Sequence, residues 1–228
     1  MFVSKRHMHD LARGEAVLVV GLGRFGSSLA RELADGGVEV LGIDTDEDLV
    51  QQHSTQLTHV VRGDASREDL LRQLAVGEFT FAVVAIGSHL ESSILVASHL
   101  LKLGVPNIWA KAISEAHGQI LDQLGIHHVV YPEHDMGRRV AHLLSESVTE
   151  YTDLGGGFAM VTAPVPPGAV GKPVSQLRPR EHHDVTIVAA RKPDGDWSHV
   201  TDQSTLDWGD IVLLTGPEQA LEAFTDLA

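Results

Sequence analysis

Residues 16–26, AVLVVGLGRFG, join an apolar run directly to the glycine pattern Gly21-Leu22-Gly23-Arg24-Phe25-Gly26. A short apolar run that ends in glycines is typical of a buried strand. Residues 26–36 then carry apolar side chains at helical spacing and close on two glycines. Because G-x-G-x-x-G between a strand and a helix is the dinucleotide-binding fingerprint, this stretch predicts the start of a Rossmann-like domain.

Each glycine has an expected task in this fingerprint. Gly21 allows the tight turn, Gly23 lets the backbone approach a pyrophosphate, and Gly26 lets the helix pack closely on the sheet. The helix then offers unpaired N–H groups and partial positive charge to phosphate. Arg24, at the tip of the loop, is expected to face phosphate oxygens or a neighbouring subunit. The alternatives are a glycine-rich turn without a ligand and a solvated loop arginine.

Polar and small residues follow the next three expected strands. Asp44 ends the second strand, at the spacing where an acid accepts hydrogen bonds from ribose hydroxyls and repels the 2′-phosphate of NADP. Asp64 follows the third strand and Gly87 follows the fourth. Ligands of open α/β sheets gather at this carboxyl edge, so all three residues are candidates for ligand contact. The alternative for each is ordinary turn chemistry.

Strand and helix alternate six times up to residue 148, which predicts a doubly wound parallel sheet with right-handed crossovers. The alternation then stops, and the glycine-rich segment 153–157 is expected to be a linker. We therefore expect an N-terminal tail at 1–15, a nucleotide-binding domain at 16–152 that includes a long last helix, and a small α+β domain at 158–228. A domain of that size would gain stability from dimerisation.

The composition excludes several classes of protein. The chain has 228 residues, a formal net charge of −14 and no cysteine. The negative charge argues against a nucleic-acid binder, and the lack of cysteine excludes disulfides, thiolate metal sites and cysteine nucleophiles. No signal peptide or membrane span is expected, since Glu91 interrupts the apolar segment 79–101. The 14 histidines lack metal-ligand spacing and are expected to be solvated, and no G-x-S-x-G motif indicates a hydrolase.

Several stretches together resemble the RCK nucleotide-binding domain, and more closely the cytosolic regulatory subunits of Ktr/Trk potassium uptake systems. They lie within residues 17–144 and are VVGLGRFGSSLARELADGGVEVLGIDTDE, GDASREDLL, VVAIGSHLESS and NIWAKAISEAHGQILDQLGIHHVVYPEHDMGRRVA. The later strings GKPVSQL and LDWGDIVLLTGP resemble the small RCK C-terminal domain. Together these stretches account for nearly the whole chain.

The resemblance implies a gating-ring protein and not an enzyme. Such subunits are cytoplasmic and form homodimers that assemble into rings, commonly octamers. They sit at the inner face of the cell membrane by gripping a membrane potassium-translocating subunit (KtrB/TrkH-like). ATP and ADP would occupy the Rossmann site and favour different ring shapes, which bias the pore toward active or inactive states. Some relatives bind cyclic di-AMP at the C-terminal domain, and whether this chain does so stays open.

The resemblance also assigns the residues around the nucleotide. It implies that the phosphate loop is made by Gly21, Gly23, Phe25 and Gly26. Arg24 would contact the terminal phosphate, across the dimer in one arrangement. Asp44 would hold the ribose, and Asp64 with Ala65 would border the adenine.

The resemblance also implies a second group of residues, on the phosphate side of the nucleotide. Gly87, Lys111 and His117 would line it, and Glu133 in the string YPEHDMG would hold a divalent cation, Mg²⁺ or Ca²⁺, beside the phosphates. Such a cation would relieve repulsion between the carboxylate and the phosphates. The alternative for Glu133 is an acid that caps the helix expected from Asp135, and the alternative for Lys111 is a surface lysine that ends a strand.

Three other functions remain open on the residues alone. The fingerprint permits a small NAD-dependent dehydrogenase, although the C-terminal residues are few for a substrate domain and contain no convincing catalytic base. It also permits an NAD(H)-binding redox sensor, which would have the same fold and differ only in ligand. A ring of the same kind could instead regulate another membrane partner, such as a cation/proton antiporter.

Overall fold

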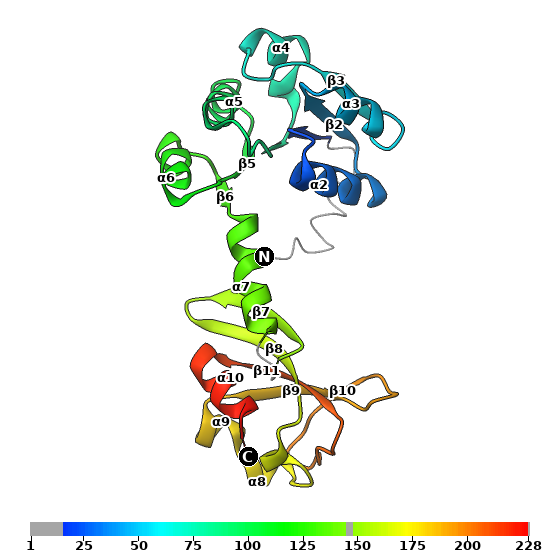
Figure 1. Ribbon diagram of the computed structural model, residues 1–228, viewed down its shortest axis with the longest axis vertical. Helices are drawn as coiled ribbons and strands as arrows, with labels where there is room; N and C mark the ends of the chain where they lie inside the picture. The colour runs from blue at the N-terminus through cyan, green and yellow to red at the C-terminus, as the bar shows by residue number, and fades with distance from the viewer. Residues whose placement is uncertain (1–15, 145–147, 228) are drawn as a thin grey trace. The chain divides into compact units, whose positions relative to one another are not determined.

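The computed structural model describes residues 16–144 and 148–227. It divides into two compact units, one up to Glu133 and the other from His134 onward (Figure 1). Each unit has its own hydrophobic core. No helix within the described ranges combines the length and the apolar character needed to cross a bilayer.

The first unit is built on six parallel strands. These are β1 (Val17–Val20), β2 (Val40–Asp44), β3 (His59–Arg62), β4 (Phe81–Val84), β5 (Asn107–Lys111) and β6 (His128–Val130). Their order across the sheet is β3-β2-β1-β4-β5-β6, and all neighbours pair in parallel. The expected doubly wound parallel sheet is confirmed. In this order the chain reverses its direction of winding between β1 and β4, and ligands of such sheets bind in the crevice beyond the carboxyl ends there.

Helices cover both faces of this sheet (Figure 1). In β1, Val17 and Val19 belong to the core beneath α2, while Leu18 and Val20 belong to the core with α4, α5 and α6. Alternate residues of a strand point to opposite faces, so a strand that is apolar throughout needs cover on both. The helical elements of this unit are α2 (Arg24–Asp35), α3 (Glu47–His53), α4 (Glu68–Gln73), the 3-10 helix η1 (Val76–Glu78), α5 (Leu90–Lys102) and α6 (Glu115–Leu124). A further helix, α7 (Pro132–Leu143), begins at the division between the two units.

The last of these helices differs from its expected bounds. The sequence predicts a helix that begins at Asp135, whereas α7 begins at Pro132. Proline is favoured in the first turn of a helix because its missing N–H has no partner to lose there. Glu133 therefore lies within the first turn of α7.

The second unit is an antiparallel sheet with small helices, which confirms the expected small α+β domain. Its strand order is β10-β9-β11-β8-β7. Val161, Leu214 and Phe224 are among the side chains that form its core. The elements are β7 (Glu150–Gly155), β8 (Phe158–Pro164), η2 (Pro167–Ala169), α8 (Val174–Leu177), α9 (Pro179–His183), β9 (Thr186–Arg191), β10 (Trp197–His199), β11 (Ile211–Pro217) and α10 (Glu218–Thr225).

The segment 153–157, expected to be a linker, lies instead in a β-hairpin. β7 pairs with β8 from Glu150 to Gly155, and the three glycines at 155–157 have positive φ angles, which suits a tight turn. Tyr151 on β7 is buried in the core of the second unit. The strand before the glycines is therefore part of the second unit, and the division between the units falls near the start of α7.

Candidate nucleotide-binding site

The three glycines after β1 are required for different reasons. Gly21 has a φ of +94°, and a Cβ there would lie 3.1 Å from the Ala85 carbonyl carbon. A Cβ on Gly26 would overlap the Gly21 carbonyl oxygen. Gly23 has an ordinary φ of −66°, and a Cβ there would meet nothing within 4 Å. The folded chain alone thus explains Gly21 and Gly26, whereas the space in front of Gly23 is open.

Asp44 lies at the carboxyl end of β2 and is tied to this loop. The Leu22 N–H donates to Asp44 Oδ2 at 2.6 Å, and the Asp46 N–H donates to Oδ1 at 2.9 Å. Each carboxylate oxygen offers two lone pairs, so both retain acceptor capacity for hydroxyl groups. The half-buried carboxylate is therefore held in one orientation at the edge where the loop begins.

Asp64 follows the neighbouring strand β3 on the same edge. Its Oδ1 accepts hydrogen bonds from the Ser66 hydroxyl at 2.6 Å and from the Ser66 N–H at 3.0 Å. These bonds to the charged form lower the pKa of Asp64 below its usual value. The Ala65 side chain, by contrast, is buried in the core. Asp64 therefore presents a fixed, ionised carboxylate to solvent, whereas the Ala65 side chain faces the core.

A second group of side chains meets on the other side of the glycine loop. Lys111 ends β5 and is buried, and its Nζ donates to Glu133 Oε1 at 2.5 Å. The same Nζ lies 5.8 Å from the centre of the Phe25 ring, and a Cβ on Gly87 would come within 3.3 Å of it. The alternative interpretation of Lys111 as a surface lysine is therefore wrong.

The charges in this group favour an anion. The hydrogen bond from Lys111 is the largest cause that lowers the pKa of Glu133, and the positive charge of Arg24 lowers it further. Both cations stand near the N-terminal end of α2, where the helix dipole adds partial positive charge. Glu133 itself is exposed, and its position in the first turn of α7 also suits an acid near a helix start.

His117 does not join this group by any hydrogen bond that the structure describes. It is buried, its backbone N–H donates to Ser114 Oγ at 3.2 Å, and its ring Nδ1 accepts from the Ile113 N–H at 3.3 Å. Burial lowers the pKa of His117, so the ring is neutral at pH 7. The expectation that the histidines are solvated is wrong for His117 and also for His53, both of which are fully buried.

The fit of a divalent cation depends on the ligand. Among residues 16–144 and 148–227, no group of three or more His, Asp or Glu side chains could hold a metal ion. Glu133 supplies one carboxylate, and Lys111 already binds it. A hard cation prefers six or more oxygen ligands, so at Glu133 it would need phosphate oxygens or water to complete its shell.

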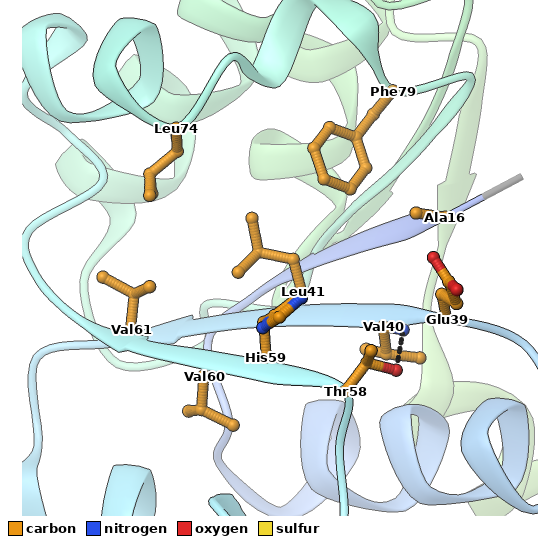
Figure 2. Close-up of a pocket in the computed structure, with 10 residues that line it drawn as sticks. All are labelled: Ala16, Glu39, Val40, Leu41, Thr58, His59, Val60, Val61, Leu74 and Phe79. Atoms are coloured by element: carbon orange, nitrogen blue, oxygen red, sulfur yellow. Dashed lines mark hydrogen bonds between the residues drawn. The ribbon is translucent and has the colours of Figure 1, made fainter.

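The cavity in Figure 2 lies elsewhere on the first unit. It has a volume of about 390 Å³ and is lined mainly by apolar side chains, including Leu41, Val61 and Phe79. Its other walls come from the amino ends of the strands, where Thr58 Oγ1 accepts from the Val40 N–H at 3.1 Å. The glycine loop and Asp44 stand at the carboxyl ends, so this cavity is not part of the candidate site.

The sequence did not predict the side-chain contacts that Ser27 and His53 make at the glycine loop. The Ser27 hydroxyl donates to the Leu22 carbonyl oxygen and contacts the ring of His53. Neither residue belongs to the glycine pattern. His53 stands in the polar string QQHS, which gives no sign that its ring is buried.

Comparison with known proteins finds one family over both units. Residues 17–132 match the TrkA-N domain and residues 158–228 match the TrkA-C domain. Ktr system potassium uptake protein C from Bacillus subtilis (strain 168) is 36% identical over 175 residues, which are 76% of this chain and 79% of that protein. Ktr system potassium uptake protein A from Vibrio alginolyticus is 30% identical over 204 residues, 89% of this chain and 93% of that protein.

A solved structure described as the GsuK channel bound to NAD is also similar. It aligns with 94% of this chain and 38% of its own chain, at 25% identity and a TM-score of 0.51. The likeness extends across both units of the present chain.

Proposed function

The chain belongs to the family of proteins that join a TrkA-N domain to a TrkA-C domain, and from this we propose that it is a nucleotide-binding regulatory subunit of a potassium uptake system. The relatives with the highest identities cited above are Ktr system potassium uptake proteins, and the matches span most of each chain. The function is regulatory, and we propose no reaction for it.

One observation carries the nucleotide part of the proposal. The space in front of Gly23 is open, and the glycine loop follows β1, which lies in the sheet between β2, which ends in Asp44, and β5, which ends in Lys111. A nucleotide could place its ribose on Asp44 and its phosphates over the loop, at the N-terminus of α2. The GsuK channel, which is described as bound to NAD, supports a nucleotide in a related chain.

We propose ATP and ADP as the regulating pair, with Arg24 and Lys111 on the phosphate side. Glu133 would hold a divalent cation only together with phosphate oxygens, because the chain offers it a single carboxylate there. Two nucleotides move a conformational equilibrium only by the ratio of their affinities for its two states. A tenfold ratio supplies about 1.4 kcal/mol per site, and a ring of several sites multiplies that value.

We base the proposed partner, oligomeric state and location on the family to which the chain belongs. The partner would be a membrane potassium-translocating subunit, and the chain would work as a homodimer within an octameric ring. It would be cytoplasmic and held at the inner face of the membrane through that partner. Cyclic di-AMP at the C-terminal unit remains a further candidate ligand.

An NAD(H)-binding redox sensor is the second candidate. It is favoured by the NAD in the GsuK structure and by Asp44, whose carboxylate suits the ribose of NAD as well as that of ATP. The two candidates differ in which ligand changes the activity of the partner.

Rubidium flux tests the proposed function. Liposomes would hold the membrane potassium-translocating subunit from the genome that encodes this chain. Flux would be measured with and without the chain, at saturating ATP, ADP, NADH or NAD. We expect flux to depend on the chain and to differ between ATP and ADP. Flux that responds to NADH and NAD alone would favour the redox sensor, and flux that ignores the chain would overturn the proposal.

A further inference from the structure

A buried histidine outside the glycine pattern holds the glycine loop. His53, the last residue of α3, has no exposed surface. Its Nε2 lies 2.7 Å from Ser27 Oγ, and the Ser27 hydroxyl donates to the carbonyl oxygen of Leu22. A chain of two contacts therefore joins α3 to the peptide between Leu22 and Gly23.

The hydrogen bonds at Ser27 can be arranged in only one way. A serine hydroxyl carries a single proton, and here it is directed at Leu22. Ser27 Oγ must then accept from His53, so the histidine Nε2 carries a hydrogen. The other ring nitrogen lies 3.1 Å from the exposed side-chain amide of Gln56, which can present oxygen or, after a half-turn, nitrogen. The bond to Ser27 is therefore available to the neutral and to the charged ring.

The Leu22 carbonyl matters because of the group at the other end of its peptide. In a planar trans peptide the C=O and the following N–H point in opposite directions. Because the Leu22 carbonyl points at Ser27, the Gly23 N–H points away from Ser27, and Gly23 itself is exposed. Phosphate would approach the loop from its exposed side.

Leu22 is also fixed by its side chain and by its own N–H. Its N–H donates to Asp44 Oδ2, and its side chain is fully buried. A Cβ on Gly42 would come within 3.1 Å of the Leu22 methyl carbons, so the leucine packs directly on β2. The contact from Ser27 completes this set, since it fixes the peptide group that Asp44 does not reach.

We propose that His53 is a positioning residue for the nucleotide site and acts through Ser27 on the Leu22 carbonyl. The inference rests on the proposed function, because the loop that His53 holds is the one assigned to the phosphates. A fully buried imidazole is costly unless it is hydrogen-bonded. Its bonds to Ser27 and Gln56 meet that need, and only the first of them reaches the loop.

Calorimetric titration of ADP into four single variants, and into the double variant that combines His53→Leu with Ser27→Ala, tests the inference. His53→Leu removes the donor, Ser27→Ala removes the link, and His53→Gln keeps an N–H donor near the position of Nε2. Ser28→Ala, at the adjacent exposed serine of α2, is the matched control.

We expect His53→Leu and Ser27→Ala to weaken ADP binding by about 3- to 10-fold, the worth of one hydrogen bond. The double variant should be no weaker than either single one, because both act on the same carbonyl. His53→Gln should bind within about twofold of the unmodified chain, as should Ser28→Ala. Unchanged binding by a folded His53→Leu variant, or equal loss in the Gln and Leu variants, would overturn the inference.

A second measurement separates this inference from the proposed function. Hydrogen–deuterium exchange of residues 20–27 in the ligand-free protein needs no nucleotide. We expect faster exchange there in His53→Leu than in His53→Gln, with exchange in β4 unchanged. If the unmodified chain binds no ADP, ATP or NADH, the proposed function fails. Hydrogen–deuterium exchange then decides alone whether His53 positions the loop. Equal exchange in the two variants would then reject the positioning role.

Discussion

Replacing Gly23 with alanine should separate nucleotide binding from folding at the glycine loop. Gly23 has a φ of −66°, and its Cβ would meet no heavy atom within 4 Å. Alanine is therefore sterically allowed there. The expected cost is a poorer N-cap for α2, about 1 kcal/mol or less in the free energy of unfolding.

Gly26→Ala is the matched comparison within the same loop. Its Cβ would overlap the Gly21 carbonyl oxygen and come within 3.0 Å of the Ala85 Cβ. One of these groups must move, and overpacking of this kind costs about 1–3 kcal/mol. Gly26→Ala should therefore lower both the stability of the chain and its affinity for nucleotide.

The effect of Gly23→Ala should appear only when a nucleotide binds. The added methyl group occupies the space through which a phosphate oxygen would approach the backbone. If it forces the same overpacking of about 1–3 kcal/mol in the complex, ADP should bind about 5- to 150-fold more weakly.

Two assays would be read together for these variants. Urea unfolding gives the free energy of unfolding, and calorimetric titration gives the dissociation constant for ADP. The reasoning is refuted if Gly23→Ala binds ADP as tightly as the unmodified chain. It is equally refuted if Gly23→Ala loses as much stability as Gly26→Ala.

Two further predictions concern charged and titrating groups. Glu133→Gln should tighten ADP binding about fivefold without divalent cations, because a carboxylate near the phosphates is removed. The same variant should abolish any increase in ADP affinity that Mg²⁺ causes. An increase that survives in Glu133→Gln would contradict the assignment of Glu133. Burial and the hydrogen bond to Glu218 raise the pKa of Tyr151 to about 12. The stability that Tyr151 contributes should therefore be complete below pH 10 and lost as the pH rises from 10 to 12. Ultraviolet titration of Tyr131→Phe, which leaves one of the two tyrosines, should show a midpoint near 12, and a midpoint near 10 would contradict it.

The fold of the first unit could be predicted because each of its elements carries a local signal. Apolar runs such as residues 16–20 mark strands that are buried on both faces. Glycines and helical spacing then separate one strand from the next. The order of the strands follows from the parallel crossovers, which leave few arrangements.

The second unit was harder to predict because its signals are not local. β7 ends at Gly155, two residues after Asp153, and two more glycines follow it, a composition that flexible linkers share. What makes it a strand is its pairing with β8 and the burial of Tyr151. β10 is only three residues long and none of its residues is buried, so it has no alternation of buried and exposed side chains to detect.

The candidate site could be predicted in part. The glycines and Asp44 form a recognisable pattern because backbone shape and spacing both appear in sequence. The ion pair of Lys111 and Glu133 joins residues from β5 and α7 that only the fold brings together. The burial of His53 depends on how α3 packs, and its polar neighbours in the sequence conceal it.

Competition between nucleotides tests the central claim most directly. ATP, ADP and NADH would each be titrated into the unmodified chain, alone and in the presence of one another, with Asp44→Ala as the variant of the site. We predict saturable binding of adenine nucleotides at one site, mutual exclusion among those that bind, and weaker binding in Asp44→Ala. Absence of binding by all three, or binding that Asp44→Ala leaves unchanged, would contradict the account.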